Sequence, residues 1–300
     1  MTILETTRQK SKWRRFPGPA RPIRLMLVNL RLLFLVLLSP FWISTAHAQL
    51  PADNPVPGGI AVVGLDVISR TAPAVRFGDR HIMVLKNSEN WYAIVGLAST
   101  LVPGNYILTV TTDSEIKSIQ RFLIKPLSAS TAQRTMQLPD SLSELPFAPV
   151  ISSNSLALSM ALWKYQVQPD FVFSPVVESK LLIPYGLLVN ANLVENYIKH
   201  FCVTYFSPAN ALVYSPAAGI VERIMSTETA GTQIYISHGQ GLTSILSHIG
   251  ETILKPGQEI ESGELIGVVE PILDQQNGRV DWGLMLNGNL VDPLQFSPSS

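Results

Sequence analysis

The chain has 300 residues, of which 46% are hydrophobic and 15% are charged, and its formal net charge is zero. This length is typical of two domains, and the apolar content suffices for hydrophobic cores. The balanced charge excludes a protein that binds nucleic acid through a strongly basic surface.

The N-terminal segment has the three parts of a secretory signal. Residues 1–24 are rich in Lys and Arg, an apolar run follows from Leu25 to Ile43, and the segment closes on Ala46-His47-Ala48. The pattern predicts a signal peptide over residues 1–48, cleaved before Gln49, and therefore an exported, periplasmic protein. The alternative is an uncleaved anchor in the inner membrane, because residues 25–43 have about the length of a spanning helix.

Short apolar runs alternate with turns from Ile60 to about Pro126. Examples are the runs 81–85 and 91–95, which are separated by the turn residues 87–90. Runs at this spacing, rich in β-branched and aromatic residues, are typical of an antiparallel sandwich. We therefore predict a small Ig-like β-sandwich over residues 49–126, which serves as a spacer or docking module because it holds no cluster of titratable residues.

The β pattern fades over residues 127–170. Within this stretch, apolar residues recur at helical spacing from Ser155 to Trp163, which predicts a helix in a connector between two domains. From Phe171 the β pattern returns and continues to the C-terminus, so that residues 171–300 are expected to form a second β domain.

This second domain carries a series of short motifs in a fixed order. They are Val213-Tyr214-Ser215-Pro216-Ala217-Ala218-Gly219-Ile220-Val221, Ile234-Tyr235-Ile236-Ser237-His238-Gly239, Leu246-Ser247-His248, Lys255-Pro256-Gly257-Gln258, Ser262-Gly263-Glu264, Asn287-Gly288 and Val291-Asp292-Pro293. In this order the motifs resemble the LytM/lysostaphin-type zinc metallopeptidases, peptidase family M23, which cut peptide bonds in peptidoglycan. The resemblance implies a mainly β chain with a LytM-type antiparallel β domain at its C-terminal end.

The metal motifs of that family are changed in this chain. The family's H-x-x-x-D motif corresponds to His200-Phe201-Cys202-Val203-Thr204, and its H-x-H motif corresponds to Arg279-Val280-Asp281. By this resemblance His200 keeps a zinc ligand, whereas Thr204 and Asp281 replace the other two. His248 matches a catalytic histidine, Arg279 replaces the other one, and His238 is interpreted as structural.

The replacements are unfavourable for zinc. A catalytic zinc site supplies three protein ligands and leaves a fourth position for water. Thr204 is a poor ligand because its hydroxyl is neutral, and Arg279 faces the same side of a strand as Asp281. A guanidinium about 5 Å from Zn²⁺ would cost on the order of 6 kcal/mol at an effective dielectric constant of ~20. We therefore expect no cofactor.

One substituted zinc site stays open as an alternative. In an extended segment His200 and Cys202 share a face, and together with Asp281 they offer imidazole, thiol and carboxylate ligands. Cys202, the only cysteine of the chain, is otherwise interpreted as a small buried hydrophobic residue.

These observations predict an exported, non-catalytic LytM-like protein that binds a peptidoglycan peptide or contacts and regulates an envelope protein. Its binding groove is predicted to be lined by Tyr214, His238, His248, Arg279, Asp281 and Trp282. Arg279 suits a ligand carboxylate because its guanidinium pairs in a forked geometry. The alternatives are an active zinc endopeptidase with substituted ligands and a purely structural envelope subunit.

Overall fold

A computed structural model describes residues 50–128, 134–137, 173–190, 197–227, 230–272 and 276–296. These residues are almost entirely β, and the one helical element among them is the short 3-10 helix η1 (Pro293–Phe296). The predicted mainly β class is therefore confirmed. The predicted signal segment and the predicted helix at 155–163 lie outside the described residues. Within the described part, no helix is long and apolar enough to cross a membrane.

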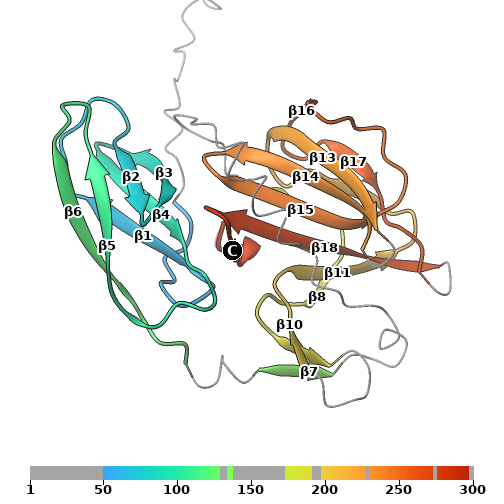
Figure 1. The fold of residues 1–300 in the computed structure, drawn as a ribbon. Coiled ribbons are helices and arrows are strands. Elements are labelled where there is room, and N and C mark those ends of the chain that lie inside the picture. The colour runs from blue at the N-terminus through green and yellow to red at the C-terminus, as the bar shows by residue number, and fades with distance from the viewer. Residues whose placement is uncertain are drawn as a thin grey trace, which may run out of the picture. The chain divides into compact units, whose positions relative to one another are not determined.

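The N-terminal strands form a six-stranded arrangement in the order β1-β4-β3-β2-β5-β6 (Figure 1). The first half of β3 pairs with β2 and its second half pairs with β4, so that β3 joins two layers. Val75, Leu108 and Trp91 pack in the core between these layers. The strands are β1 (Ile60–Leu65), β2 (Ala74–Phe77), β3 (Arg80–Asn87), β4 (Asn90–Gly96), β5 (Gly104–Thr111) and β6 (Lys117–Ile124).

The C-terminal strands form a larger sheet in the order β16-β13-β14-β15-β18-β11-β8, with β19 paired to β18 (Figure 1). All pairings in this sheet are antiparallel, and a separate two-stranded sheet joins β12 to β17. The strands are β8 (Lys180–Ile183), β11 (Val203–Pro208), β12 (Leu212–Tyr214), β13 (Gly219–Thr227), β14 (Gly231–Gly239), β15 (Leu242–Ile249), β16 (Glu259–Ile260), β17 (Leu265–Val268), β18 (Asn277–Leu286) and β19 (Asn289–Val291).

A small three-stranded sheet has the order β10-β9-β7 and comprises β7 (Thr135–Gln137), β9 (Leu188–Asn190) and β10 (Tyr197–Lys199). β7 lies inside the segment predicted as a connector and pairs in parallel with β9. A three-residue strand carries too little periodic pattern to be predicted from its own sequence.

The alternation of side chains along β18 divides the larger sheet into a core face and a polar face. Val280, Trp282 and Leu284 enter the main hydrophobic core, whereas Arg279 and Asp281 point to the opposite face. This division positions the site that is described below.

Hydrogen bonds connect the N-terminal strands to the larger sheet within the compact unit Ala46–Ser300. The side-chain amide of Gln240, in the turn between β14 and β15, accepts from the Val84 N–H (2.8 Å) and donates to the Val84 carbonyl (3.2 Å). Near the C-terminus, the Ala52 N–H donates to the Gln295 carbonyl at 2.8 Å. The two β regions are therefore joined through both side-chain and backbone groups.

Candidate functional site

The candidate site lies where β11 and β18 run side by side. Thr204 in β11 stands directly opposite Asp281 in β18, and Ser247 in β15 stands opposite Asp281 on its other side. His200 lies just before β11, and its backbone is fixed by hydrogen bonds from the Gly186 N–H and to the Leu187 carbonyl. The register therefore brings the residues of the two altered motifs together, as the sequence predicts.

A buried arginine occupies the centre of this site. Arg279 and Asp281 are only 2% and 1% exposed. The Arg279 guanidinium donates from Nη2 to His248 Nε2 at 2.8 Å, and Arg279 Nε lies 3.6 Å from Asp281 Oδ2. Because a guanidinium only donates, His248 Nε2 must accept, and the ring proton of a neutral His248 is on Nδ1.

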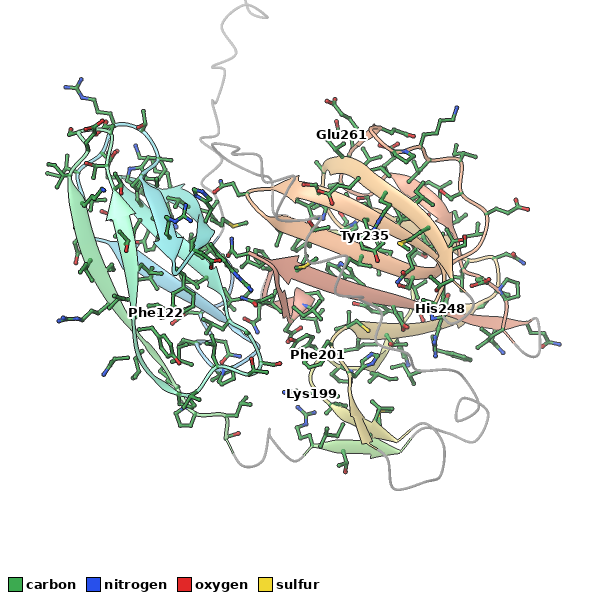
Figure 2. All side chains as sticks on the ribbon, in the orientation of Figure 1. Phe122, Lys199, Phe201, Tyr235, His248 and Glu261 are labelled. Atoms are coloured by element: carbon green, nitrogen blue, oxygen red, sulfur yellow. The ribbon has the colours of Figure 1, made fainter. Side chains whose placement is uncertain are left out.

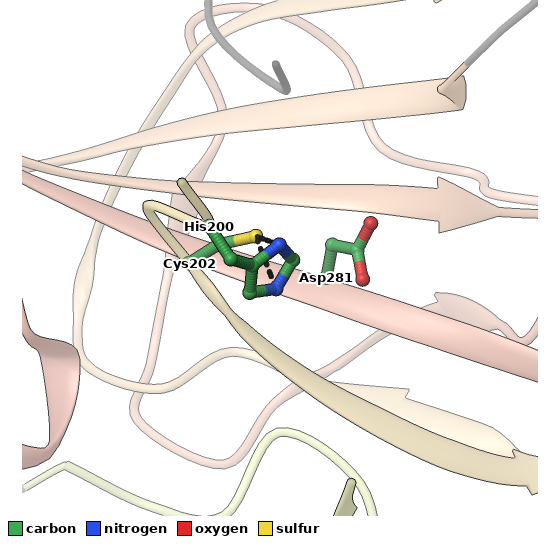
Figure 3. Close-up of side chains that lie close together, drawn as sticks. All are labelled: His200, Cys202 and Asp281. Atoms are coloured by element: carbon green, nitrogen blue, oxygen red, sulfur yellow. Dashed lines mark hydrogen bonds between the residues drawn. The ribbon is translucent and has the colours of Figure 1, made fainter. Parts of the chain in front are cut away.

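Thr204 connects the other side of the carboxylate to His200. The Thr204 hydroxyl donates to Asp281 Oδ1 at 2.6 Å, and its oxygen lies 2.9 Å from His200 Nε2. The Cys202 sulfur also lies within hydrogen-bond distance of His200 Nε2, at 3.2 Å (Figure 3). Both carboxylate oxygens and the inward-facing nitrogen of His200 therefore already have protein partners.

Burial and charge set the protonation states. Burial raises the pKa of the Asp281 carboxyl, but the neighbouring Arg279 guanidinium lowers it by more, so the pKa lies well below its usual range. Burial lowers the pKa of His200 and raises that of the Cys202 thiol. The site thus holds one ion pair, Arg279 with Asp281, surrounded by neutral His200, Cys202 and Thr204.

Two family models match this chain. "Peptidase family M23" matches residues 199–293 and "Peptidase family M23 N-terminal domain" matches residues 53–125. The chain belongs to peptidase family M23. No curated protein matches the chain significantly.

Solved structures share the M23 fold. A putative peptidase M23 from Pseudomonas aeruginosa is 23% identical with a TM-score of 0.63, and the match covers 81% of this chain and 95% of that one. The catalytic domain of the antimicrobial peptidase lysostaphin from Staphylococcus simulans is 20% identical with a TM-score of 0.34, covering 39% and 91% of the two chains. A chain from the SpoIIQ–SpoIIIAH pore-forming complex is 15% identical with a TM-score of 0.36, covering 42% and 90%.

The M23 family implies zinc, and the residues of this site can be tested for their fit to it. The nearest set is His200, Cys202 and Asp281, whose ligand atoms all lie within 4.8 Å of one another (Figure 3). A zinc ligand must offer a lone pair or a negative charge. The Thr204 hydroxyl lies between His200 Nε2 and Asp281 Oδ1, and the Arg279 guanidinium lies beside Asp281 Oδ2, so a zinc ion held by Asp281 would have to displace these contacts next to a fixed positive charge. The residues in this arrangement do not fit a catalytic zinc ion.

Two predicted groove residues lie on the other face of the sheet. His238 and Trp282 are 1% and 2% exposed, and both contact Ser244: His238 Nε2 at 2.8 Å and Trp282 Nε1 at 3.1 Å. His238 Nδ1 donates to the Ala218 carbonyl at 2.8 Å, and burial lowers the His238 pKa to about 4. These side chains belong to the core rather than to a groove, and the alternation along β18 explains why Trp282 cannot share a face with Asp281.

Tyr214 lies apart from the altered motifs, in the two-stranded sheet. It is the last residue of β12, it pairs with Leu265 of β17, and its N–H donates to the Val176 carbonyl at 2.8 Å. Of the six predicted groove residues, the structure therefore brings together His248, Arg279 and Asp281.

One further charged residue adjoins the site and was not predicted. Glu270 Oε2 lies 3.9 Å from His248 Nδ1, and the Glu270 N–H donates to the His248 carbonyl at 3.0 Å. This contact depends on the isolated bridge between Ile249 and Val269. Neither the spacing nor the type of Glu270 signals that pairing in the sequence.

Proposed function

We propose that this chain is an exported, non-catalytic member of peptidase family M23 that binds a cell-wall peptide or contacts an envelope protein. The observation that carries the proposal is the position of Arg279, whose guanidinium donates to His248 and lies beside Asp281. In the family motif both positions 279 and 281 are histidines. A fixed cation thus stands where the family has a catalytic histidine, beside the position of a metal ligand.

The arginine stabilises a metal-free arrangement. Breaking a buried ion pair by leaving one partner alone costs about 3–5 kcal/mol. If Asp281 bound a zinc ion instead of Arg279, the buried guanidinium would lose its counter-charge and would also repel the metal ion. Thr204 adds to the effect, because its short hydrogen bond holds the second carboxylate oxygen. Without a polarised water, His248 has no nucleophile to activate.

The same burial changes the predicted role of Arg279 in ligand binding. A residue that is 2% exposed and paired with Asp281 does not reach a ligand carboxylate in solution. Arg279 is therefore assigned to the structure of the site, and binding of a wall peptide requires a more exposed part of the molecule.

The test combines metal analysis with a designed reversion. The exported chain, purified without chelator, is expected to contain well under one zinc per chain and to leave peptidoglycan intact. The triple variant Thr204→Asp, Arg279→His, Asp281→His restores both family motifs around His200 and His248, and is expected to bind zinc stoichiometrically. Stoichiometric zinc in the unmodified chain, with peptidoglycan cleavage abolished by His200→Ala, would overturn the proposal.

One observation favours the alternative of an active enzyme with substituted ligands, namely the proximity of His200, Cys202 and Asp281. If these residues bind zinc, the conservative variant Cys202→Ser should lower the zinc content of the purified chain, because it removes one of the three ligands. Under the non-catalytic proposal, Cys202→Ser leaves the low zinc content unchanged. The same metal analysis therefore decides between the two functions.

A further inference from the structure

A cavity of about 300 Å³ lies beside the small sheet, and its lining includes none of His200, Thr204, His248, Arg279 and Asp281. Its walls come from the segment 54–59 before β1, from the small sheet with its neighbouring turns, and from the end of the chain after β19. The residues with polar side chains that line it are Asn54, Arg134, Tyr185, Lys199, Asp292 and Gln295. The volume is at the lower end of the range found for small-molecule sites, roughly 300–1,000 Å³.

The small sheet places two cations at this cavity. The Leu188 N–H donates to the Arg134 carbonyl at 3.0 Å, and Lys199 pairs with Leu188 in the register of β9 and β10. Arg134 and Lys199 therefore flank one residue of the central strand from its two sides. The Lys199 ammonium also lies 5.6 Å from the centre of the Phe201 ring (Figure 2), which favours a defined position for the charge.

Among the described residues that line it, the cavity has one acidic residue, Asp292, against these two cations. Burial raises the pKa of Asp292, and its Oδ1 already accepts from the Leu294 N–H at 3.0 Å. The phenol of Tyr185 donates to the Leu290 carbonyl at 2.8 Å, and burial raises its pKa, so Tyr185 stays neutral. The charged lining thus has an excess of positive charge, which suits an anionic ligand.

The opposite wall consists of closely packed backbone. Gly58 has a φ of +83°, and a Cβ there would lie 3.4 Å from the Tyr185 hydroxyl oxygen. At Gly59 a Cβ would come within 2.2 Å of the Asn54 carbonyl oxygen. These two glycines let the segment before β1 turn tightly against the C-terminal β region, without side chains of its own that would fill the cavity.

We propose that this cavity binds the free carboxylate at the end of a peptide, with Arg134 and Lys199 as its two cationic partners. Arg134 offers a forked pair of donors to the two carboxylate oxygens, and Lys199 adds a compact charge. That the peptide comes from the cell wall rests on the proposed function. The cavity would thereby bind the ligand carboxylate that the sequence assigned to Arg279, which is buried.

The experiment compares an acid with its amide on the exported chain. Calorimetry measures the binding of a synthetic tripeptide that ends in D-alanyl-D-alanine, with either a free carboxylate or a C-terminal amide. The acid is expected to bind at least about tenfold more tightly, because a charge-assisted hydrogen bond is worth about 1.5–3 kcal/mol. The double variant Arg134→Ala, Lys199→Ala should lose this preference, while its affinity for the amide changes little.

The matched control is Lys117→Ala, Arg121→Ala, which removes two exposed charges from β6. It should keep the preference of the unmodified chain for the acid. Equal affinity of the unmodified chain for acid and amide would overturn the proposal without any need for a variant. The same holds if neither peptide binds, or if soluble wall fragments bind the double variant as tightly as the unmodified chain. In that last case a wall-binding function stands without the cavity, and zinc content and hydrolysis still decide separately whether the protein is an enzyme.

Discussion

Two buried histidine clusters lie on opposite faces of the larger sheet and satisfy their polar atoms differently. On the core face His238 donates to a backbone carbonyl and contacts Ser244, which also contacts Trp282, so that every member is neutral. On the other face His248 accepts from Arg279, which is paired with Asp281. We expect a fall in pH to destabilise the fold through the neutral cluster, whereas the charged cluster destabilises the fold when one of its two charged partners is removed.

The largest effect is expected from removing the cation of the charged cluster. Arg279→Met leaves Asp281 buried without its counter-charge, and we expect the free energy of unfolding to fall by about 3–5 kcal/mol. Urea denaturation at neutral pH measures the change. The double variant Arg279→Met, Asp281→Asn should recover part of the loss, because it no longer buries an uncompensated charge.

A matched control for this variant is Arg223→Met in β13. Arg223 is only partly buried, and its guanidinium lies 4.3 Å from the centre of the Tyr235 ring. Its removal should cost far less than the removal of Arg279, about 1 kcal/mol. Equal losses for the two arginines would show that Arg279 contributes packing rather than charge compensation.

The neutral cluster is tested by acid. His238 binds a proton near pH 6.5 when unfolded and near pH 4 when folded. Between these values the unfolded state holds more protons, so stability falls as the pH falls. The loss from this residue is about 3 kcal/mol at most, since each pH unit between the two pKa values contributes about 1.4 kcal/mol.

Denaturation curves at several pH values measure this loss. His238→Gln keeps a polar side chain without a titrating group, and its stability should fall less steeply between pH 6.5 and 4 than that of the unmodified chain. His200, whose pKa is also lowered by burial, contributes with the same sign to both proteins. Parallel curves for the two proteins would assign the acid sensitivity to another residue.

Part of this comparison follows from the sequence. The order of the motifs indicates the β class and the meeting of positions 200, 204, 279 and 281, because that frame fixes the turns and the register. The alternation of side chains along a strand already places Asp281 and Trp282 on opposite faces of the sheet, although the predicted groove included both. The contact of Glu270 with His248 and the pairing of β7 with β9 depend on register between segments without a local pattern, and no spacing in the sequence encodes them.

The smallest effect concerns Thr204, which links a charged residue to a neutral one. Thr204→Val keeps the shape of the side chain but removes the hydroxyl that donates to Asp281 and lies 2.9 Å from His200 Nε2. We expect the free energy of unfolding to fall by about 2 kcal/mol, the magnitude of a hydrogen bond to a charged group. Thr204→Ser retains the hydroxyl and should cost clearly less, since it loses only one methyl group. If both variants are equally destabilised, packing of the methyl group rather than the hydrogen bond accounts for the loss, and Thr204 does not hold Asp281 in its metal-free position.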